Sequence, residues 1–384
     1  MLREKSVLFT PIQIGNALLS NRFMRSATWE GKSDENGFPK ESLLKMMKNL
    51  ALGDCGLIVP GFAYPMKKCQ VASNQTGMFT PGHAKAWKST IDEIHNETTS
   101  KIIFQICHGG SKSSPELSGS VPEAPTAMSS DVHEMTNSDI EATIQSFIDA
   151  AVNLKANGAD GIQIHCAHGY LLSAFLSPAL NRRHDGWGGS PENRVKIVKE
   201  IASEIRKSCG QEFLISAKIN GDDYDDSIGV TPVLCGWYIS QLNDIDMFEI
   251  SAGVGSRMYG TRINFDTNLY MRMIKPKSDA IEAVKVAEEA SKDVPYFEGY
   301  NIDATNTIRR IAPNAKLAIV GGLRNFDTMD HVVAGGTADM ISMARPFIRQ
   351  PSLVKDLKKG TDDSKCISCA LCSYGNKGVT CYYP

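Results

Sequence analysis

The hydrophobic pattern along the chain predicts short strands that alternate with longer helices. Apolar runs predict strands at 22–26, 55–59, 101–107, 161–165, 213–218, 247–251, 316–320 and 340–343. Stretches with a helical period predict helices at 41–52, 84–97, 139–157, 192–207 and 326–334. This alternation indicates parallel pairing, because parallel strands need long crossover connections.

Two α/β architectures fit this pattern: an open doubly wound sheet and a closed (β/α)8 barrel. The count of eight strands favours the barrel. We therefore predict a single (β/α)8 TIM barrel over residues 1–355, followed by a short cysteine-rich tail over residues 356–384 that binds metal. No glycine-rich linker and no further internal repeat is visible.

The predicted strands end in polar residues or glycine. In a barrel these ends meet at one mouth, where the chemistry of this fold takes place. The residues there are Ala27, Thr28, Gly61, Gln105, His108, His165, His168, Lys218, Ser251, Gly253, Gly321, Gly322, Ala344 and Arg345. His165 closes the fourth strand, so we expect it and His168 to face the mouth.

The last two strand ends favour a phosphate site. Loops after the seventh and eighth barrel strands commonly bind phosphate through backbone N–H groups and a cation. Gly321-Gly322 alone would also fit tight strand-to-helix turns. Arg345 favours the phosphate, since a guanidinium binds it in bidentate fashion.

Composition adds few constraints. The net charge of −2 gives no electrostatic reason to expect binding to nucleic acid or to an anionic membrane. No signal peptide or membrane span is visible, so we expect a cytoplasmic location. Ten cysteines in such a protein suggest free thiols or metal ligands.

The spacing of His165 and His168 leaves two alternatives to a ligand-binding pair. The two side chains could be metal ligands, with His108 as the third, or satisfied structural histidines. Of these interpretations, we expect a metal site to be the less frequent one for two histidines at this spacing.

Residues from Leu8 to Pro351 resemble the Old Yellow Enzyme family of FMN-dependent NADH:flavin oxidoreductases. The most specific match is "HCAHGYLLSAFLSPALNRRHDGWGGSPENR", supported by "LFTPIQIGNALLSNRF", "IVGGLRN" and "ADMISMARPF". The resemblance implies one barrel with FMN at its mouth. It also implies hydride transfer from NAD(P)H, by a ping-pong mechanism, to the activated C=C bond of a small enone-type substrate. A homo-oligomer is expected.

The resemblance also implies roles for individual residues. It places Ala27, Thr28 and Gly61 against the flavin, Gln105 on its pyrimidine side and Lys218 beside N1 and O2. Gly321, Gly322, Ala344 and Arg345 match the phosphate end. His165 and His168 match the pair that binds the substrate oxygen, where negative charge develops, and Tyr170 matches the proton donor.

Several features depart from the family pattern. Trp29 stands where a small residue is usual, and either narrows the pocket or fills core. The basic end of the motif after Gln105 is missing, with Gly110 and Lys112 in its place. Residues 253–300, including Arg257, Tyr259 and Arg262, form an insert that could be a lid or a subunit contact. No G-x-G-x-x-G follows a strand, so NAD(P)H is expected on the same flavin face as the substrate.

Four cysteines cluster in the tail, at Cys366, Cys369, Cys372 and Cys381. Three of them are spaced by three residues and the fourth lies apart, a pattern typical of a [4Fe–4S] cluster rather than of zinc, which usually has two separated Cys-x-x-Cys pairs. The tail resembles that of the dienoyl-CoA reductase subgroup, although the spacing of its third and fourth cysteines differs. An electron-transfer flavoprotein that passes electrons to such a cluster or to a partner is therefore the alternative function, and a non-enzymatic scaffold is a distant third.

Overall fold

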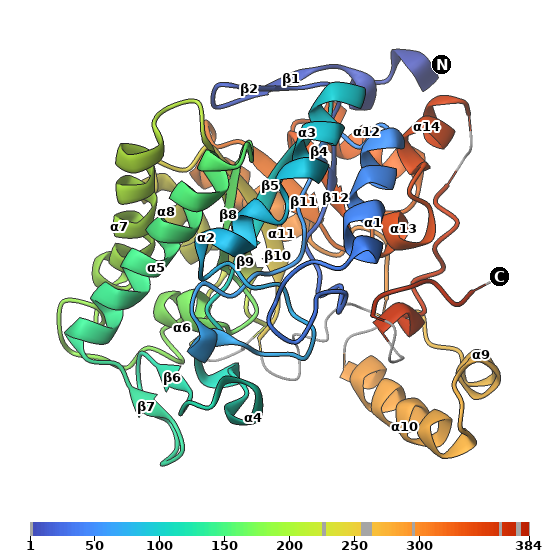
Figure 1. Ribbon diagram of the computed structural model, residues 1–384. Coiled ribbons are helices and arrows are strands. Elements are labelled where there is room, and N and C mark those ends of the chain that lie inside the picture. Colours follow the sequence, from blue (N-terminus) through green and yellow to red (C-terminus); the bar gives the residue numbers. More distant parts are fainter. Residues whose placement is uncertain are drawn as a thin grey trace.

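The structure is a computed structural model that describes residues 3–224, 228–254, 263–293, 296–360, 363–373 and 378–383. Eight parallel strands close into one barrel surrounded by helices (Figure 1). The strands are β3 (Phe23–Arg25), β4 (Leu57–Ile58), β5 (Lys101–Ile106), β8 (Gly161–Cys166), β9 (Leu214–Asp222), β10 (Met247–Ala252), β11 (Leu317–Val320) and β12 (Met340–Met343). All eight lie at the predicted positions, and the predicted (β/α)8 barrel is confirmed.

Helices follow the strands and cover the barrel. They are α1 (Glu41–Leu52), α2 (Pro81–Lys85), α3 (Lys88–Glu97), α5 (Asn137–Ala156), α7 (Pro191–Cys209), α8 (Pro232–Gln241), α11 (Ile302–Ile311) and α12 (Phe326–Ala334). The sequence explains several starts. Thr136 and Asp139 form a capping box at α5, and Ser190 accepts from the Asn193 N–H at α7.

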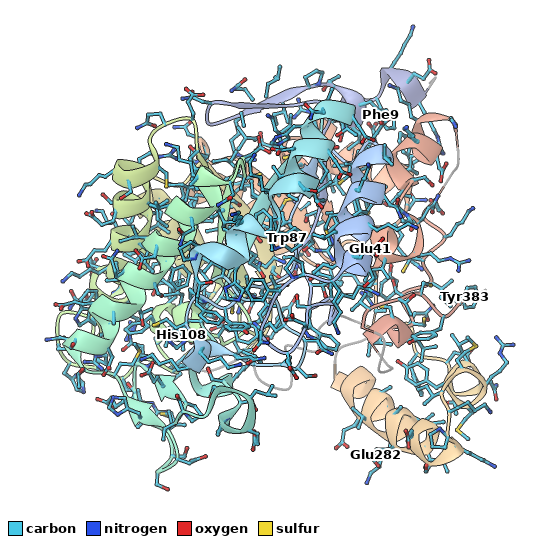
Figure 2. The ribbon with its side chains drawn as sticks, in the orientation of Figure 1. Phe9, Glu41, Trp87, His108, Glu282 and Tyr383 are labelled. Atoms are coloured by element: carbon cyan, nitrogen blue, oxygen red, sulfur yellow. The ribbon has the colours of Figure 1, made fainter. Side chains whose placement is uncertain are left out.

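The helix predicted at 84–97 is in fact the pair α2 and α3. Trp87 lies between them, fully buried, with its ring edge-on to Phe104 at a centroid distance of 4.9 Å (Figure 2). Helix α8 was not predicted because its residues, "PVLCGWYISQ", are mostly apolar and show no helical period. Tertiary packing therefore decides the helices that the local pattern leaves ambiguous.

The inside of the barrel is layered. The hairpin of β1 (Ile12–Ile14) and β2 (Ala17–Leu19) covers the end opposite the mouth, and appears at the top of Figure 1. An apolar floor lies inside, formed by Ile12, Ile14, Leu19, Met24, Leu57, Val59, Ile103, Leu214, Met247, Ala318 and Met340. The floor excludes water from this end, so polar chemistry is confined to the mouth, the end where the strands finish.

The insert after β10 packs on the tail. Helices α9 (Thr267–Met273) and α10 (Lys277–Asp293) lie beside the tail and apart from the ring of barrel helices (Figure 1). Tyr270 donates a hydrogen bond to the Cys369 carbonyl at 2.8 Å, and Leu269 and Leu371 belong to one buried cluster. The described part of the insert therefore contacts the tail. Arg257, Tyr259 and Arg262 lie outside the described residues.

The tail also contacts the barrel. Helix α14 (Leu353–Lys358) runs across the predicted boundary at residue 355, and Asn325 donates to Asp363 at 2.8 Å. The Val379 N–H donates to the Glu30 carbonyl at 2.6 Å. The division into residues 1–355 and 356–384 stays a prediction.

Gly61→Ala is expected to lower the melting temperature by about 1–4 °C, because overpacking costs on the order of 1–3 kcal/mol. A Cβ atom at Gly61 would overlap the carbonyl oxygen of Thr28, and the Gly61 N–H already donates to the Glu30 carboxylate at 2.8 Å. Gly186→Ala is the control, since its Cβ would meet only the end of the Lys196 side chain, at 4.0 Å. Equal melting temperatures of the two variants, by differential scanning fluorimetry, would contradict the packing argument.

Candidate active site

The turn after β8 brings His165, His168 and Tyr170 together. His168 and Gly169 both adopt left-handed backbone angles, with φ of 66° and 72°. The Asn220 side chain accepts from the His168 N–H at 3.2 Å, and the ammonium of Lys112 donates to the His168 carbonyl at 2.5 Å. Because a left-handed non-glycine residue is strained, these contacts hold a conformation that the local sequence alone would not favour.

The side chains of this turn form an aromatic group at the mouth. The His165 ring lies 5.2 Å from the His168 ring and 5.0 Å from the Tyr170 ring. Phe62, which follows β4, packs 5.5 Å from Tyr170, and Lys112 lies 5.1 Å above the Tyr170 ring. The structure therefore places the three predicted catalytic side chains within reach of one ligand.

Burial keeps both histidines neutral. It lowers the pKa of His165 well below its usual value, with His168 and Lys218 adding to the effect. Burial, followed by the charges of Lys218 and Lys112, lowers the pKa of His168 to about 3. The Ala167 N–H donates to Nδ1 of His165 at 3.3 Å, so the single ring proton of His165 is on Nε2. His165 is thus a neutral hydrogen-bond donor.

His168 has a competing partner. Its Nε2 lies 2.7 Å from the hydroxyl of Ser251, on β10. Ser251 was noted among the strand ends without a role, and the structure makes it the neighbour that orients this ring. A ligand oxygen that binds Nε2 of His168 has to share it with the Ser251 hydroxyl.

His108 does not join the histidine pair. Its Nε2 lies 3.3 Å from the Glu123 carboxylate, and its Nδ1 accepts from the Gly110 N–H at 3.0 Å. Within the described ranges, no three His, Cys, Asp or Glu side chains converge closely enough to hold a single metal ion. The geometry gives no support to a metal site on His165 and His168.

A ring of polar side chains fills the barrel between the floor and the mouth. The carboxylate of Glu249, on β10, accepts hydrogen bonds from Ser26 at 2.6 Å, Ser342 at 2.7 Å and Gln163 at 3.0 Å. The Lys218 ammonium lies 3.3 Å from it. Sequence reasoning missed Glu249, Gln163 and Ser342. The available signal was a polar residue within an otherwise apolar strand, as in "GIQIHC" and "MFEISA".

Gln105 and Lys218 both contact this ring. Gln105 donates through Nε2 to Gln163 at 2.7 Å, which leaves its own amide oxygen as an acceptor. Lys218 donates to Ser26 at 2.9 Å and to the Ala27 carbonyl at 3.3 Å. The two residues predicted to contact a flavin are therefore linked through hydrogen-bonding side chains at the base of the mouth.

The ends of β11 and β12 enclose a small pocket, which we call the glycine–arginine pocket. It is lined by Tyr300, Val320, Gly321, Gly322, Leu323, Arg324, Ser342, Met343, Ala344, Arg345, Pro346 and Ser368. Gly321 and Gly322 have φ of 144° and 70°, and a Cβ on Gly322 would come within 2.7 Å of the Phe297 carbonyl oxygen. Glycine is thus required at this turn. The pocket gathers the four residues predicted to bind phosphate.

The ends of β3 and β4 are closely packed. Thr28 and Gly61 are in direct backbone contact, which gives Gly61 a structural reason to be glycine. Trp29 donates its indole N–H to the Ser73 carbonyl at 3.2 Å and lies against Gly31. The indole therefore has a defined packing position of its own.

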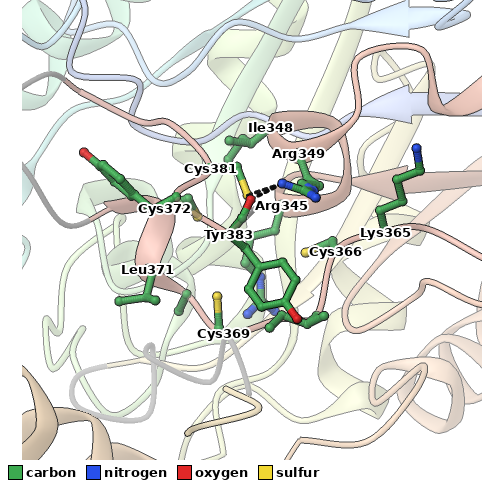
Figure 3. Close-up of a pocket in the computed structure, with 13 residues that line it drawn as sticks. Arg345, Ile348, Arg349, Lys365, Cys366, Cys369, Leu371, Cys372, Cys381 and Tyr383 are labelled. Carbon is green, nitrogen blue, oxygen red and sulfur yellow. Dashed lines mark hydrogen bonds between the residues drawn. The ribbon is translucent and has the colours of Figure 1, made fainter. Parts of the chain in front are cut away.

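The four tail cysteines line a second pocket, the cysteine pocket (Figure 3). The other side chains around it include those of Arg345, Ile348, Arg349, Leu371 and Tyr383.

Hydrogen-bond donors reach sulfur atoms there. The Ser368 N–H donates to Sγ of Cys366 at 3.4 Å, and Arg349 donates to Sγ of Cys381 at 3.8 Å. Burial raises the pKa of Cys372 to about 11, against the opposing charge of Arg345. Without a ligand the Cys372 thiol therefore stays protonated and unreactive at neutral pH.

None of the helices in the described part of the chain has both the length and the apolar character needed to cross a membrane.

The chain is similar to known enzymes that are named for NADH or NADPH. It is 27% identical to an NADH oxidase of Thermoanaerobacter brockii, over 96% of this chain and 54% of that protein. It is also 27% identical to an NADPH dehydrogenase of Bacillus subtilis, over 92% of this chain and 94% of that protein. The chain thus spans about half the length of the first relative and nearly all of the second.

Solved structures share the barrel. A 2-naphthoyl-CoA reductase, solved in complex with 2-naphthoyl-CoA, superposes with a TM-score of 0.81 at 25% identity, over 97% of this chain and 55% of that one. An old yellow enzyme homologue from Zymomonas mobilis superposes with a TM-score of 0.73 at 21% identity, over 94% and 95% of the two chains, which shows the fold.

The sequence profile of one family matches residues 7–235, well over half of the chain. This stretch includes the turn after β8 and the most specific of the motifs that suggested Old Yellow Enzyme, so the resemblance to that family is confirmed. The resemblance of the cysteine tail to the dienoyl-CoA reductase subgroup stays a prediction. The chain belongs to the NADH:flavin oxidoreductase / NADH oxidase family.

Proposed function

We propose that this protein is an NAD(P)H-dependent FMN oxidoreductase that reduces the activated C=C bond of a small α,β-unsaturated carbonyl compound. The observation that carries the proposal is the neutral His165–His168–Tyr170 group at the same mouth as the glycine–arginine pocket. Membership of the flavin oxidoreductase family supports it. The neighbour solved with 2-naphthoyl-CoA adds aromatic acyl thioesters to the compounds worth testing.

The residues at the mouth fit FMN. The glycine–arginine pocket offers backbone N–H groups and the Arg345 guanidinium to a phosphate. Gln105 offers an amide oxygen to the pyrimidine N–H, and Lys218 supplies a cation at the base of the mouth. Ala27 and Thr28 would form the wall at β3. Bound FMN would supply the hydride exchange between NAD(P)H and the substrate.

The catalytic roles follow from charge and geometry. When hydride reaches the substrate β-carbon, negative charge develops on its carbonyl oxygen. The Nε2–H of His165 would donate to that oxygen, together with His168, and because both rings are neutral they donate without losing a proton. Tyr170, whose ring centroid lies 5.0 Å from that of His165, would deliver a proton to the α-carbon as general acid.

NAD(P)H would bind in the same mouth as the substrate. The sequence offers no separate dinucleotide fingerprint, and the mouth has one aromatic group that can stack on a nicotinamide or hold an enone. Reduction and oxidation would therefore alternate, which is ping-pong turnover. A homo-oligomer remains a prediction.

The cysteine pocket supports the alternative, an electron-transfer flavoprotein. A single zinc ion needs all its thiolates about 2.3 Å away, whereas a four-iron cluster binds each thiolate to a different iron and tolerates wider spacing. The four cysteines line one pocket, although among the described residues no three of them converge closely enough to hold a single metal ion. The preference for a cluster over zinc therefore rests on their spacing along the sequence. Arg345 lines both this pocket and the glycine–arginine pocket, so the two sites share a wall.

The purified protein is expected to contain non-covalent FMN, and Arg345→Met should weaken FMN binding about tenfold or more, the cost of a charge-assisted hydrogen bond. Fluorescence titration of the flavin-depleted protein measures the dissociation constant. Arg310→Met removes the same charge from the exposed end of α11 and should leave the constant unchanged. Binding of FAD instead, or a folded protein that takes up no added FMN, would refute the FMN site.

Replacing both His165 and His168 with alanine should slow alkene reduction by a factor of about 10² to 10³ for each lost donor, within non-additivity. Stopped-flow reduction by NADH should change less, because no oxyanion forms in that half-reaction. Tyr170→Phe should slow the reduction only of substrates that need a proton on carbon. Quinones need none, so their reduction serves as the control.

The pH dependence provides a check on the same assignment. Both folded-state pKa values lie far below 6.5, so alkene reduction should show no histidine titration between about pH 5 and 8. Alkene turnover that survives the double replacement nearly intact would show that the histidines have another role.

Protein purified anaerobically is expected to contain about four iron and four sulfide per chain. Cys369→Ala should lose the iron, and Cys235→Ala, at a buried cysteine of α8 remote from the tail, should keep it. Iron, sulfide and zinc analysis decides the outcome. Fresh anaerobic protein that contains neither metal would leave the four residues as free thiols or a disulfide pair.

A further inference from the structure

Glu249 is a charged residue that the proposed reaction does not use. Its side chain is fully buried inside the barrel. Its hydrogen-bond donors come from three other parts of the barrel: Ser26 directly after β3, Gln163 on β8 and Ser342 on β12. A buried carboxylate is costly unless charge and hydrogen bonds compensate it. A carboxylate that is buried at the base of the mouth and compensated by this many hydrogen bonds indicates a role beyond filling space.

The cation that compensates Glu249 is Lys218. The two residues are paired in the register of β9 and β10, and His165 is the register partner of Lys218 on β8. Three hydrogen-bond acceptors surround the Lys218 ammonium: the Glu249 carboxylate at 3.3 Å, the Ser26 hydroxyl at 2.9 Å and the Ala27 carbonyl at 3.3 Å. Lys218 is therefore half of a buried ion pair at the level of the catalytic histidine.

A cation beside a flavin makes its reduced, anionic form easier to generate, and a carboxylate next to that cation cancels part of the effect. The effective dielectric constant inside a barrel is low, so solvent screens the interaction between Glu249 and Lys218 only weakly at their separation of 3.3 Å. The net charge of the pair is zero. What a ligand above it would sense is the dipole of the pair, which is weaker than the field of a lone ammonium.

We propose that Glu249 is a positioning residue that pairs with Lys218 and keeps the flavin less readily reduced than a lone lysine would make it. The inference rests on the proposed FMN site. By this inference, the reduction potential of the bound flavin depends on a residue of β10, although no predicted flavin contact lies on that strand.

Sulfite provides a readout that is independent of turnover. It adds to oxidised flavin and leaves a negative charge on the ring, so its dissociation constant, measured by bleaching of the flavin absorbance, reports the local positive charge. The assay is run at about pH 6, because burial lowers the pKa of Lys218. Under these conditions Glu249→Gln should bind sulfite about tenfold more tightly than the wild type. Lys218→Met should bind it about tenfold more weakly. The flavin midpoint potential should rise in the first variant and fall in the second.

Two controls separate charge from packing. Ser26→Ala removes one hydrogen bond to Glu249 but no charge, and should leave the sulfite constant within about threefold of the wild type. The double variant Glu249→Gln/Lys218→Met contains no unpaired buried charge, so it folds even where the single glutamine variant does not. It should bind sulfite about tenfold more tightly than Lys218→Met alone.

The outcomes are distinguishable. A wild-type protein that binds no FMN would overturn the proposed function and this inference with it. Normal FMN binding with equal sulfite constants in the double variant and Lys218→Met would overturn the inference alone. A shift in Ser26→Ala as large as that in Glu249→Gln would also overturn it, because packing rather than charge would then be responsible.

Discussion

The mouth of this barrel depends on one buried charge, the Glu249 carboxylate. Removing either partner of a buried ion pair typically costs about 3–5 kcal/mol, because the remaining charge stays in an apolar interior. The donors to Glu249 belong to β8, β9, β12 and the residue after β3. Satisfying one carboxylate therefore ties four separate parts of the barrel together at one level.

The His165–His168–Tyr170 group adjoins this polar ring on the side of the mouth, and the apolar floor lies on the other side of the ring. His165 occupies the same register level as Lys218, and the next turn holds His168 through Asn220 and Lys112. Because the floor excludes water and the turn is fixed by contacts from other strands, the two imidazoles stay neutral and oriented before any ligand arrives. Preorganised donors of this kind stabilise developing charge without the cost of rearrangement.

The sequence was sufficient for the strands, their ends and the turn after β8, because strand periodicity and the position of the polar ends are local features. It was not sufficient for the polar ring. Glu249 and Gln163 lie inside correctly predicted strands, but which strand positions face inward, and which of them meet, depends on the stagger of the closed barrel. Lys218 was predicted as a flavin partner, whereas its pairing with a residue thirty-one positions later follows only from the register of β9 and β10. The split of one predicted helix at Trp87 has a similar origin, since core packing decided it.

Arg345 connects the two chemistries that the chain could combine. Its guanidinium donates to the Ser368 carbonyl at 3.1 Å, and Ser368 both lines the glycine–arginine pocket and donates its N–H to Cys366. The phosphate end of the proposed FMN site and the cysteine loop are thus held by the same side chain. Tyr270 of the insert donates to the next carbonyl along that loop, at Cys369, so the insert is attached to the same structure. A change in the ligand of either pocket would have to be accommodated by the other, so the two proposed activities, reduction of a small substrate and electron transfer to a cysteine-bound centre, would depend on one connected structure.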